Sequence, residues 1–129
     1  MKIALAIAVL GLGVAVPLLA HHSLAEYDSS RVATIKGAVT SVDWRNPHVL
    51  IHVDVTSADG RVVNWSVETW GTGQLAVRGL TNGFLKPNDR VKIAVFLAKD
   101  GTARAVVRTL TLPDGQKVDG PPVDFTPTR

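Results

Sequence analysis

Residues 44–55, with the sequence WRNPHVLIHVDV, decide the fold. Asn46-Pro47 is typical of a turn, and the residues that follow divide into two alternating sets. Alternation with a period of two indicates a strand with one buried face. We therefore expect this strand to have a core face and an open face. The core face carries Val49, Ile51, Val53 and Val55, and the open face carries His48, Leu50, His52 and Asp54.

The segment that follows is expected to pair with this strand. Asp59-Gly60 is a hairpin signal, and a three-residue loop at 58–60 with Gly60 in the left-handed conformation aligns residues 61–69 with the strand. A two-residue loop would mix core and open faces, so we expect the longer loop. The resulting core pairs are Val55–Val63, Val53–Trp65 and Ile51–Val67.

The remaining elements follow from the same patterns. A strand at 34–44 changes phase, which a bulge at Gly37 or at Thr40-Ser41 would explain, and residues 72–78 are compatible with a helix that stops at Gly79. Two more alternating strands are expected at 90–98 and 103–112, joined by a turn that places Ala103 and Ala105 opposite Leu97 and Val95.

Five strands with a short helix between the third and the fourth match the element order of an OB-fold. The sequence therefore predicts an all-β fold, a small five-stranded OB-like barrel. An open five-stranded sheet or sandwich is the alternative. After a signal peptide at 1–20, we expect an N-terminal arm at 21–31, the barrel at 32–112 and a Pro/Gly-rich tail at 113–129.

The N-terminal segment has the pattern of a secretory signal peptide. Lys2 precedes an apolar run at 3–16, and Pro17–Ala20 resembles a cleavage region. The run is shorter than the roughly 20 apolar residues of a membrane span, so we expect no stable membrane anchor after cleavage; a retained anchor helix is the alternative. A cut after Ala25 is the alternative to a cut after Ala20. Either cut predicts a periplasmic or secreted protein.

The composition narrows the classes of function. A cut after Ala20 leaves 109 residues with 13 basic and 11 acidic side chains, a formal net charge of +2. That balance does not predict a nucleic-acid partner. The chain has no Cys, and Met1 is its only Met. The mature protein therefore has neither disulfides nor the sulfur ligands that soft metals prefer.

The open face of the predicted hairpin gathers polar side chains. Its register places Glu68 diagonally between His48 and His52, and diagonal neighbours lie about 7–8 Å apart. The two histidines are about 13 Å apart along the strand, too far to share an ion at bond lengths of about 2.0–2.1 Å. The expected pairs are Asp54–Asn64, His52–Ser66, Leu50–Glu68 and His48–Trp70.

The N-terminal arm could complete a metal site on this face. After a cut at Ala20, the free amine and imidazole of His21 form a chelate, and His22 adds a second imidazole. Such ligands suit Cu(II) or Zn. The candidate metal ligands are His21, His22, one of His48 and His52, and Glu68. The alternative is structural, with His52 hydrogen-bonded to Ser66 and His48 capping the turn.

Other ligands fit the same face. Trp70 could stack on a small ligand, with Ser66 and Asn64 as polar contacts. A metal-free interaction module that binds a protein or another envelope component is the second hypothesis. Neither Ser23 nor Ser66 lies in the Gly context of a nucleophile elbow, so we assign no catalytic residue. Glu68 as a general base keeps an enzyme as a remote alternative.

Several short motifs resemble a family of small exported bacterial proteins of unknown function. The motifs are His21 to Asp28, Gly37-Ala38-Val39, Trp44 to His48, Asp59-Gly60, Leu85-Lys86-Pro87 with Asp89, Ala98 to Gly101, and Leu112 to Gly115. The resemblance implies a secreted single domain cut just before His21, and it implies no known activity. The chain departs from the pattern at Trp70 to Gly73, where a Ser-Pro-Asn-like helix start is usual.

Overall fold

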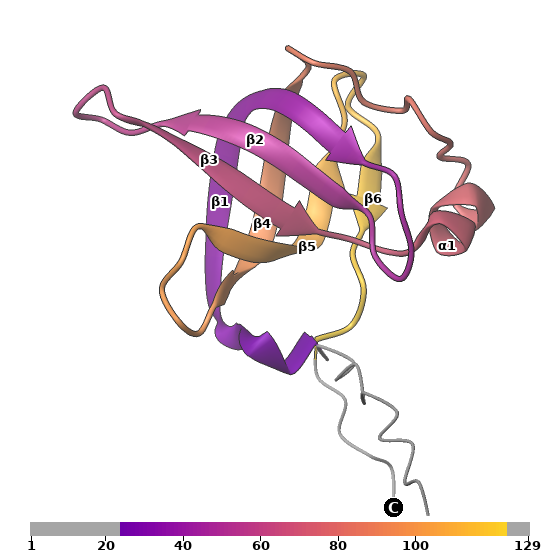
Figure 1. Ribbon diagram of the computed structural model, residues 1–129, viewed down its shortest axis with the longest axis horizontal. Coiled ribbons are helices and arrows are strands. Elements are labelled where there is room, and N and C mark those ends of the chain that lie inside the picture. Colours follow the sequence, from indigo (N-terminus) through magenta and orange to yellow (C-terminus); the bar gives the residue numbers. More distant parts are fainter. Residues whose placement is uncertain (1–23, 124–129) are drawn as a thin grey trace, which may run out of the picture.

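The computed structural model describes residues 24–123. The predicted signal peptide, His21, His22 and residues 124–129 of the predicted tail lie outside them. The fold is mostly β, as predicted (Figure 1). Its elements are η1 (Leu24–Glu26), β1 (Tyr27–Asp43), β2 (Leu50–Thr56), β3 (Val62–Glu68), α1 (Thr72–Val77), β4 (Arg90–Ala98), β5 (Arg104–Thr111) and β6 (Lys117–Asp119).

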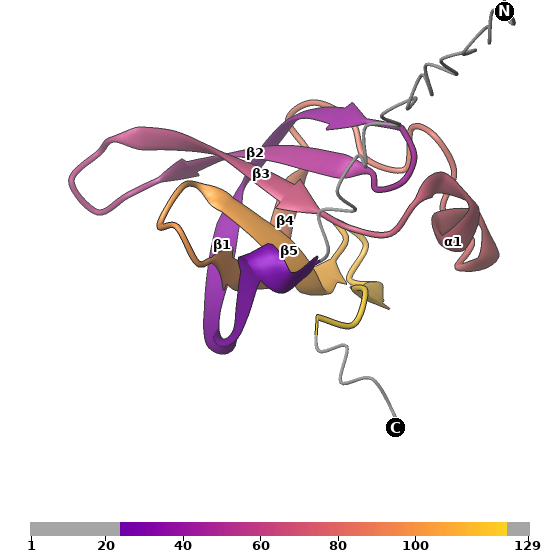
Figure 2. The same ribbon diagram turned by 60° about the horizontal axis from the view of Figure 1, so that its bottom comes forward.

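The strands form a six-stranded sheet in the order β3-β2-β1-β4-β5-β6. Neighbours in this order are antiparallel. β3 pairs in addition with β5, in parallel, from Ser66–Arg104 to Glu68–Val106. Figures 1 and 2 show the tip of the β2–β3 hairpin and helix α1 at opposite ends of the molecule.

Strand β1 is long because it serves two neighbours. Its first part pairs with β4 and its last part with β2, and Ala38 has a partner on both sides. The register shifts between Val39 and Ser41, so the bulge expected at Thr40-Ser41 is confirmed. Gly37 lies against β2, where an added Cβ would be 2.1 Å from the Asp54 carbonyl oxygen. A side chain at position 37 would therefore push the two strands apart.

The predicted β2–β3 register is confirmed pair by pair, from Leu50–Glu68 to Thr56–Val62. Gly60 has a φ of 84°, the left-handed conformation expected in the loop. Burial follows the alternation, since Val49, Ile51 and Val53 are fully buried. Trp65 and Val55, by contrast, are only half-buried at the edge of the core, and Val63, which was expected in the core opposite Val55, is 43% exposed.

The β4–β5 register differs from the prediction. Leu97 faces Ala105 and Val95 faces Val107, so the expected pairing of Ala103 and Ala105 is wrong by two residues. The cause lies in the turn, where the Asp100 carboxylate accepts hydrogen bonds from the backbone and hydroxyl of Thr102. That contact moves the loop one residue toward the C-terminus.

The structure has a sixth strand, which the five-strand prediction missed. β6 pairs with β5 within the segment expected to be a tail, and its Val118 is buried. Gly120 then runs close to β5, where an added Cβ would be 1.8 Å from the Val107 carbonyl oxygen. The three-residue strand carries a single apolar residue, which is too short a pattern to recognise in a sequence.

The middle of strand β5, residues 105–107, is buried on both faces. Ala105 and Val107 belong to the main core. Val106, between them, belongs to a second cluster with Leu24, Tyr27 and Ala98. The second cluster fixes η1 and the start of β1 against the outside of the sheet. Within residues 24–123, no helix is long and apolar enough to cross a membrane.

Candidate functional site

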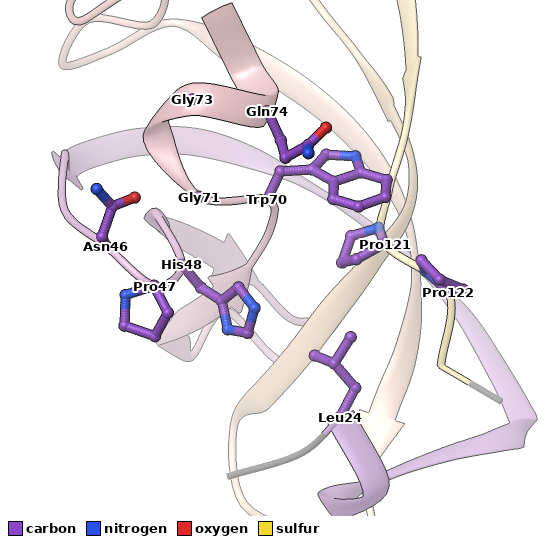
Figure 3. A pocket seen from close by; sticks show the side chains of 10 residues that line it. All are labelled: Leu24, Asn46, Pro47, His48, Trp70, Gly71, Gly73, Gln74, Pro121 and Pro122. Carbon is purple, nitrogen blue, oxygen red and sulfur yellow. The ribbon is translucent and has the colours of Figure 1, made fainter. Parts of the chain in front are cut away.

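A pocket of about 540 Å³ opens where four distant segments meet (Figure 3). Its wall combines Leu24 of η1, the turn at 46–48, residues 70–74 around the start of α1, and Pro121-Pro122 after β6. Four separate pieces of chain therefore form this wall. Two of them, the turn at 46–48 and the segment after β3 that begins with Trp70, contain residues that the sequence analysis had singled out.

Asn46 joins the turn to helix α1. Its side-chain oxygen accepts hydrogen bonds from the backbone N–H and the hydroxyl of Thr72, at 2.9 and 3.0 Å. Gly71, the residue before the helix, has no side chain with which to cap it. Asn46 thus satisfies a free N–H of the first turn in place of a local cap. This explains how the helix begins without the Ser-Pro-Asn-like start. The Asn46–Pro47 peptide bond is cis.

Gly71 has to be a glycine for steric reasons. Its φ of −69° is open to any residue, but an added Cβ would be 2.5 Å from the Pro47 carbonyl oxygen and 3.0 Å from the Asn46 side-chain oxygen. The helix start and the turn are therefore in direct backbone contact at the floor of the pocket.

Trp70 forms one wall of the pocket and is half-buried. Its Nε1–H donates to the Asp119 carbonyl oxygen at 2.8 Å, and the Arg78 guanidinium carbon lies 4.0 Å from the ring centroid. The sequence predicted that Trp70 lies opposite His48 on the open face and could stack on a small ligand. The structure instead covers one face of the ring with a cation and ties its edge to the end of β6, which stabilises the wall.

His48 lies in the pocket and is part of a hydrogen-bonded chain. Its Nδ1 contacts Glu68 Oε1, and Glu68 Oε2 accepts a hydrogen bond of 2.7 Å from the Tyr27 hydroxyl. Both carboxylate oxygens of Glu68 are therefore engaged, and Nε2 is the ring nitrogen of His48 that remains for a ligand. Figure 3 shows the imidazole between Pro47 and the wall formed by Trp70 and Pro121.

Tyr27 is the buried end of this chain. Burial, followed by the hydrogen bond to Glu68, raises the pKa of its hydroxyl. The hydroxyl therefore stays protonated and donates to Glu68 at any physiological pH. Arg104 lies 6.0 Å from the centre of the ring and forms an ion pair of 2.7 Å with Glu26, which raises the pKa of Arg104. These contacts hold η1 next to β5.

His52 has a separate set of partners. Its Nε2 lies 3.1 Å from Asp43 Oδ2, and its Nδ1 lies 3.0 Å from the Ser66 hydroxyl. Further along, Asn64 donates to Asp54 at 2.8 Å. The structure therefore brings Glu68 and Trp70 together with His48, and it leaves His52, Ser66 and Asn64 on a different part of the sheet. Among residues 24–123, no three His, Asp or Glu side chains converge as metal ligands.

Sequence reasoning missed three contributors to the site: Tyr27, Asn46 and the pair Pro121-Pro122. Tyr27 did have a signal, because Leu24 and Tyr27 are the apolar residues of an otherwise polar arm. Both are buried. The other two had no such signal. Asn46 contacts Thr72, 26 positions away in the sequence, and Pro121-Pro122 reach the pocket only because of strand β6, which was not predicted.

The fold and the site define a small β domain with one histidine at the edge of a mostly apolar pocket. The chain belongs to a family of unknown function (DUF6152), whose match spans residues 9–108. The expected membership of a family of unknown function is thereby confirmed. Comparison with curated proteins and with solved structures gave no match.

Proposed function

We propose that this protein is an exported domain that binds a borderline divalent metal ion, Cu(II) or Zn, in the pocket beside His48. One observation carries the proposal. The first described residue, Leu24, lines the same pocket as His48, so the N-terminal histidines are joined to the chain at the wall of that pocket.

The reach of the N-terminal histidines follows from chain dimensions. Three residues separate His21 from Leu24, and an extended chain covers at most about 3.6 Å per residue. His21 and His22 are therefore within about 11 Å of Leu24, which itself lines the wall. The proposed ligands are the amine and imidazole of His21, the imidazole of His22 and Nε2 of His48. Nitrogen ligands of this kind suit Cu(II) and Zn.

Glu68 takes the role of orienting His48 in this proposal. A ligating histidine usually donates its second N–H to a carboxylate, which fixes the tautomer and makes the ligand more basic. The contact of His48 Nδ1 with Glu68 has this form, and the Tyr27 hydroxyl holds the other oxygen of Glu68. Glu68 is therefore a supporting residue rather than a direct ligand, and His52 lies outside the site.

Export is part of the proposal, with the periplasm or the outside of the cell as the destination. The signal pattern at 1–20 supports it. The burial of Leu24 in the second cluster favours the cut after Ala20. A cut after Ala25 would remove both N-terminal histidines and this buried leucine.

We propose that the sheet closes as an OB-like barrel. The parallel pairing of β3 with β5 supports closure, because it joins two strands that the order of the sheet otherwise keeps apart. The position of α1 between β3 and β4 supports the same topology. OB-folds bind ligands on the face of strands 2 and 3, where His48 and Glu68 lie.

Calorimetry with Cu(II) and with Zn(II) on protein that begins at His21 tests the function. We expect a dissociation constant below about 10 μM and strong weakening when His21 and His22 are deleted. Because imidazole binds metal only when neutral, occupancy should fall below about pH 6. Absence of binding, or binding that the deletion leaves unchanged, contradicts the proposal.

A metal-free interaction module is the second candidate. The volume of about 540 Å³ lies in the range of small-molecule pockets, and Trp70, Pro47 and Pro121 offer apolar surface to a small ligand or a segment of an envelope protein. This candidate predicts that His48→Ala and Trp70→Ala weaken the partner while a chelator has no effect.

A further inference from the structure

A second hollow, of about 340 Å³, lies against the long first strand and shares no residue with the His48 pocket. Three cations line it: Lys36 of β1, and Arg90 and Lys92 of β4. All three side chains are exposed. Within residues 24–123, none of them has an ion-pair partner.

The sheet register places these charges against one another. Lys36 and Lys92 are direct partners in the β1–β4 ladder, and direct partners carry their Cβ atoms about 4.5–5.5 Å apart on the same face. Arg90 follows two residues away on the same strand and therefore on the same face. Like charges directly opposite each other destabilise a sheet, so the free protein keeps an unfavourable arrangement here.

The row continues beyond the hollow. Lys92 faces Thr111 of β5, and Thr111 faces Lys117 of β6. The Thr111 hydroxyl thus stands between two cations and adds a neutral hydrogen-bond donor. None of the residues that line the hollow carries a carboxylate.

We propose that this hollow binds a phosphate-type oxyanion, held by Lys36, Lys92 and Arg90 with Thr111 as a further donor. An oxyanion accepts charge-assisted hydrogen bonds from ammonium and guanidinium groups and removes the repulsion between Lys36 and Lys92. The group is carried either by a free phosphate or by the headgroup of an anionic phospholipid, since both present the same oxygens.

Two probes distinguish the sources. Inorganic phosphate is titrated against chloride at equal ionic strength, which holds general screening constant, with binding read from backbone amide shifts and from the melting temperature. Vesicles of phosphatidylglycerol are compared with vesicles of phosphatidylcholine by cosedimentation. We expect a dissociation constant for one of the two probes near or below about 1 mM.

The decisive variant is Lys36→Gln/Lys92→Gln. We expect it to weaken binding at least about tenfold, the loss of one or two charge-assisted hydrogen bonds, and to raise the melting temperature of the free protein because the repulsion is gone. Arg61→Gln/Lys99→Gln removes the same charge from two hairpin turns and should leave binding within about twofold. A loss of binding in Lys36→Gln/Lys92→Gln alone supports the site. The probe that binds, inorganic phosphate or phosphatidylglycerol vesicles, then identifies the source of the oxyanion.

Absence of binding by both probes overturns the proposal. So does an equal loss in the two double variants, which would mean general attraction to a basic protein. Neither result bears on the metal proposal, because the two hollows have no residue in common.

Discussion

His48 and His52 lie four residues apart in the sequence and on the same face, yet the fold gives them different surroundings. Each ring contacts a carboxylate. For His48 this is Glu68, which is largely buried and held by Tyr27, whereas for His52 it is the half-exposed Asp43. His48 also lines a pocket at the α1 end of the molecule, and His52 lies nearer the β2–β3 hairpin tip. The alternation that placed both on one face therefore could not tell them apart.

The difference between the two histidines comes from contacts made far away in the sequence. Tyr27 reaches Glu68 across 41 positions, and Pro121-Pro122 close the pocket from the end of the described chain. The pocket beside His48 is thus formed by what packs over one end of the hairpin. The following substitutions test whether the surroundings of His48, at the pocket end of the hairpin, and those of His52, nearer its tip, differ as proposed.

Exchange of each histidine for alanine should give the largest contrast. His48→Ala removes a proposed metal ligand and should weaken Cu(II) or Zn(II) binding by at least about 100-fold, because four nitrogen ligands become three. His52→Ala should change affinity less than about twofold, since its nitrogens already have protein partners. Calorimetry on both variants of the processed protein measures the contrast, and equal losses would mean that the two ends share one site.

A pair of glycines tests the structure of the pocket end. Gly71→Ala should destabilise the protein by about 2–3 kcal/mol, because its Cβ meets the Pro47 carbonyl oxygen at 2.5 Å. Gly73→Ala, two residues on and with nothing within 4 Å, should instead stabilise by up to about 1 kcal/mol through helix propensity. Urea unfolding measures both, and effects of the same sign would contradict the close contact between turn and helix.

The sequence predicted the hairpin well because its information is local. The alternation in residues 49–55 and the Asp59-Gly60 turn together determine which side chains face each other, and the pairs from Leu50–Glu68 to Val55–Val63 were confirmed. The sequence could not predict which histidine would meet a pocket, since Asn46, Tyr27 and β6 act on the site through tertiary contacts. The proposed metal ligands His21 and His22 lie outside the described residues, and their role stays a prediction.

Substitution of the carboxylate beside His48 should weaken metal binding more than substitution of the carboxylate beside His52. Glu68→Gln keeps the shape but removes the charge that orients His48, so metal affinity should fall by about 10-fold to 100-fold, as for other supporting residues of metal sites. Asp43→Asn is the matched change beside His52 and should leave affinity within about twofold. Isothermal titration of both variants gives the comparison. A larger effect of Asp43→Asn would mean that the metal binds at His52 and would contradict the proposed site at His48.

Tyr27→Phe should have the smallest effect and the clearest pH signature. Losing the hydrogen bond to Glu68 should cost about 1 kcal/mol of stability at neutral pH. The folded protein holds the Tyr27 proton more tightly than the unfolded chain does, because burial raises the pKa of Tyr27 above its ordinary value near 10. The contribution of the protonated Tyr27 hydroxyl to stability is therefore complete below about pH 10. It is lost as pH rises further, because tyrosine in the unfolded chain ionises first.

Tyr27 is the only tyrosine in the chain, so tyrosinate absorbance in the near ultraviolet reports this residue alone. We expect no ionisation near pH 10 in the folded protein, and a tyrosinate signal that appears only together with unfolding. Stability should fall with rising pH above about 10 in the wild-type protein and fall less steeply in Tyr27→Phe. Ionisation at the ordinary tyrosine pKa without unfolding would mean that the hydroxyl is not held by Glu68. The pocket end would then lose the feature that distinguishes His48 from His52.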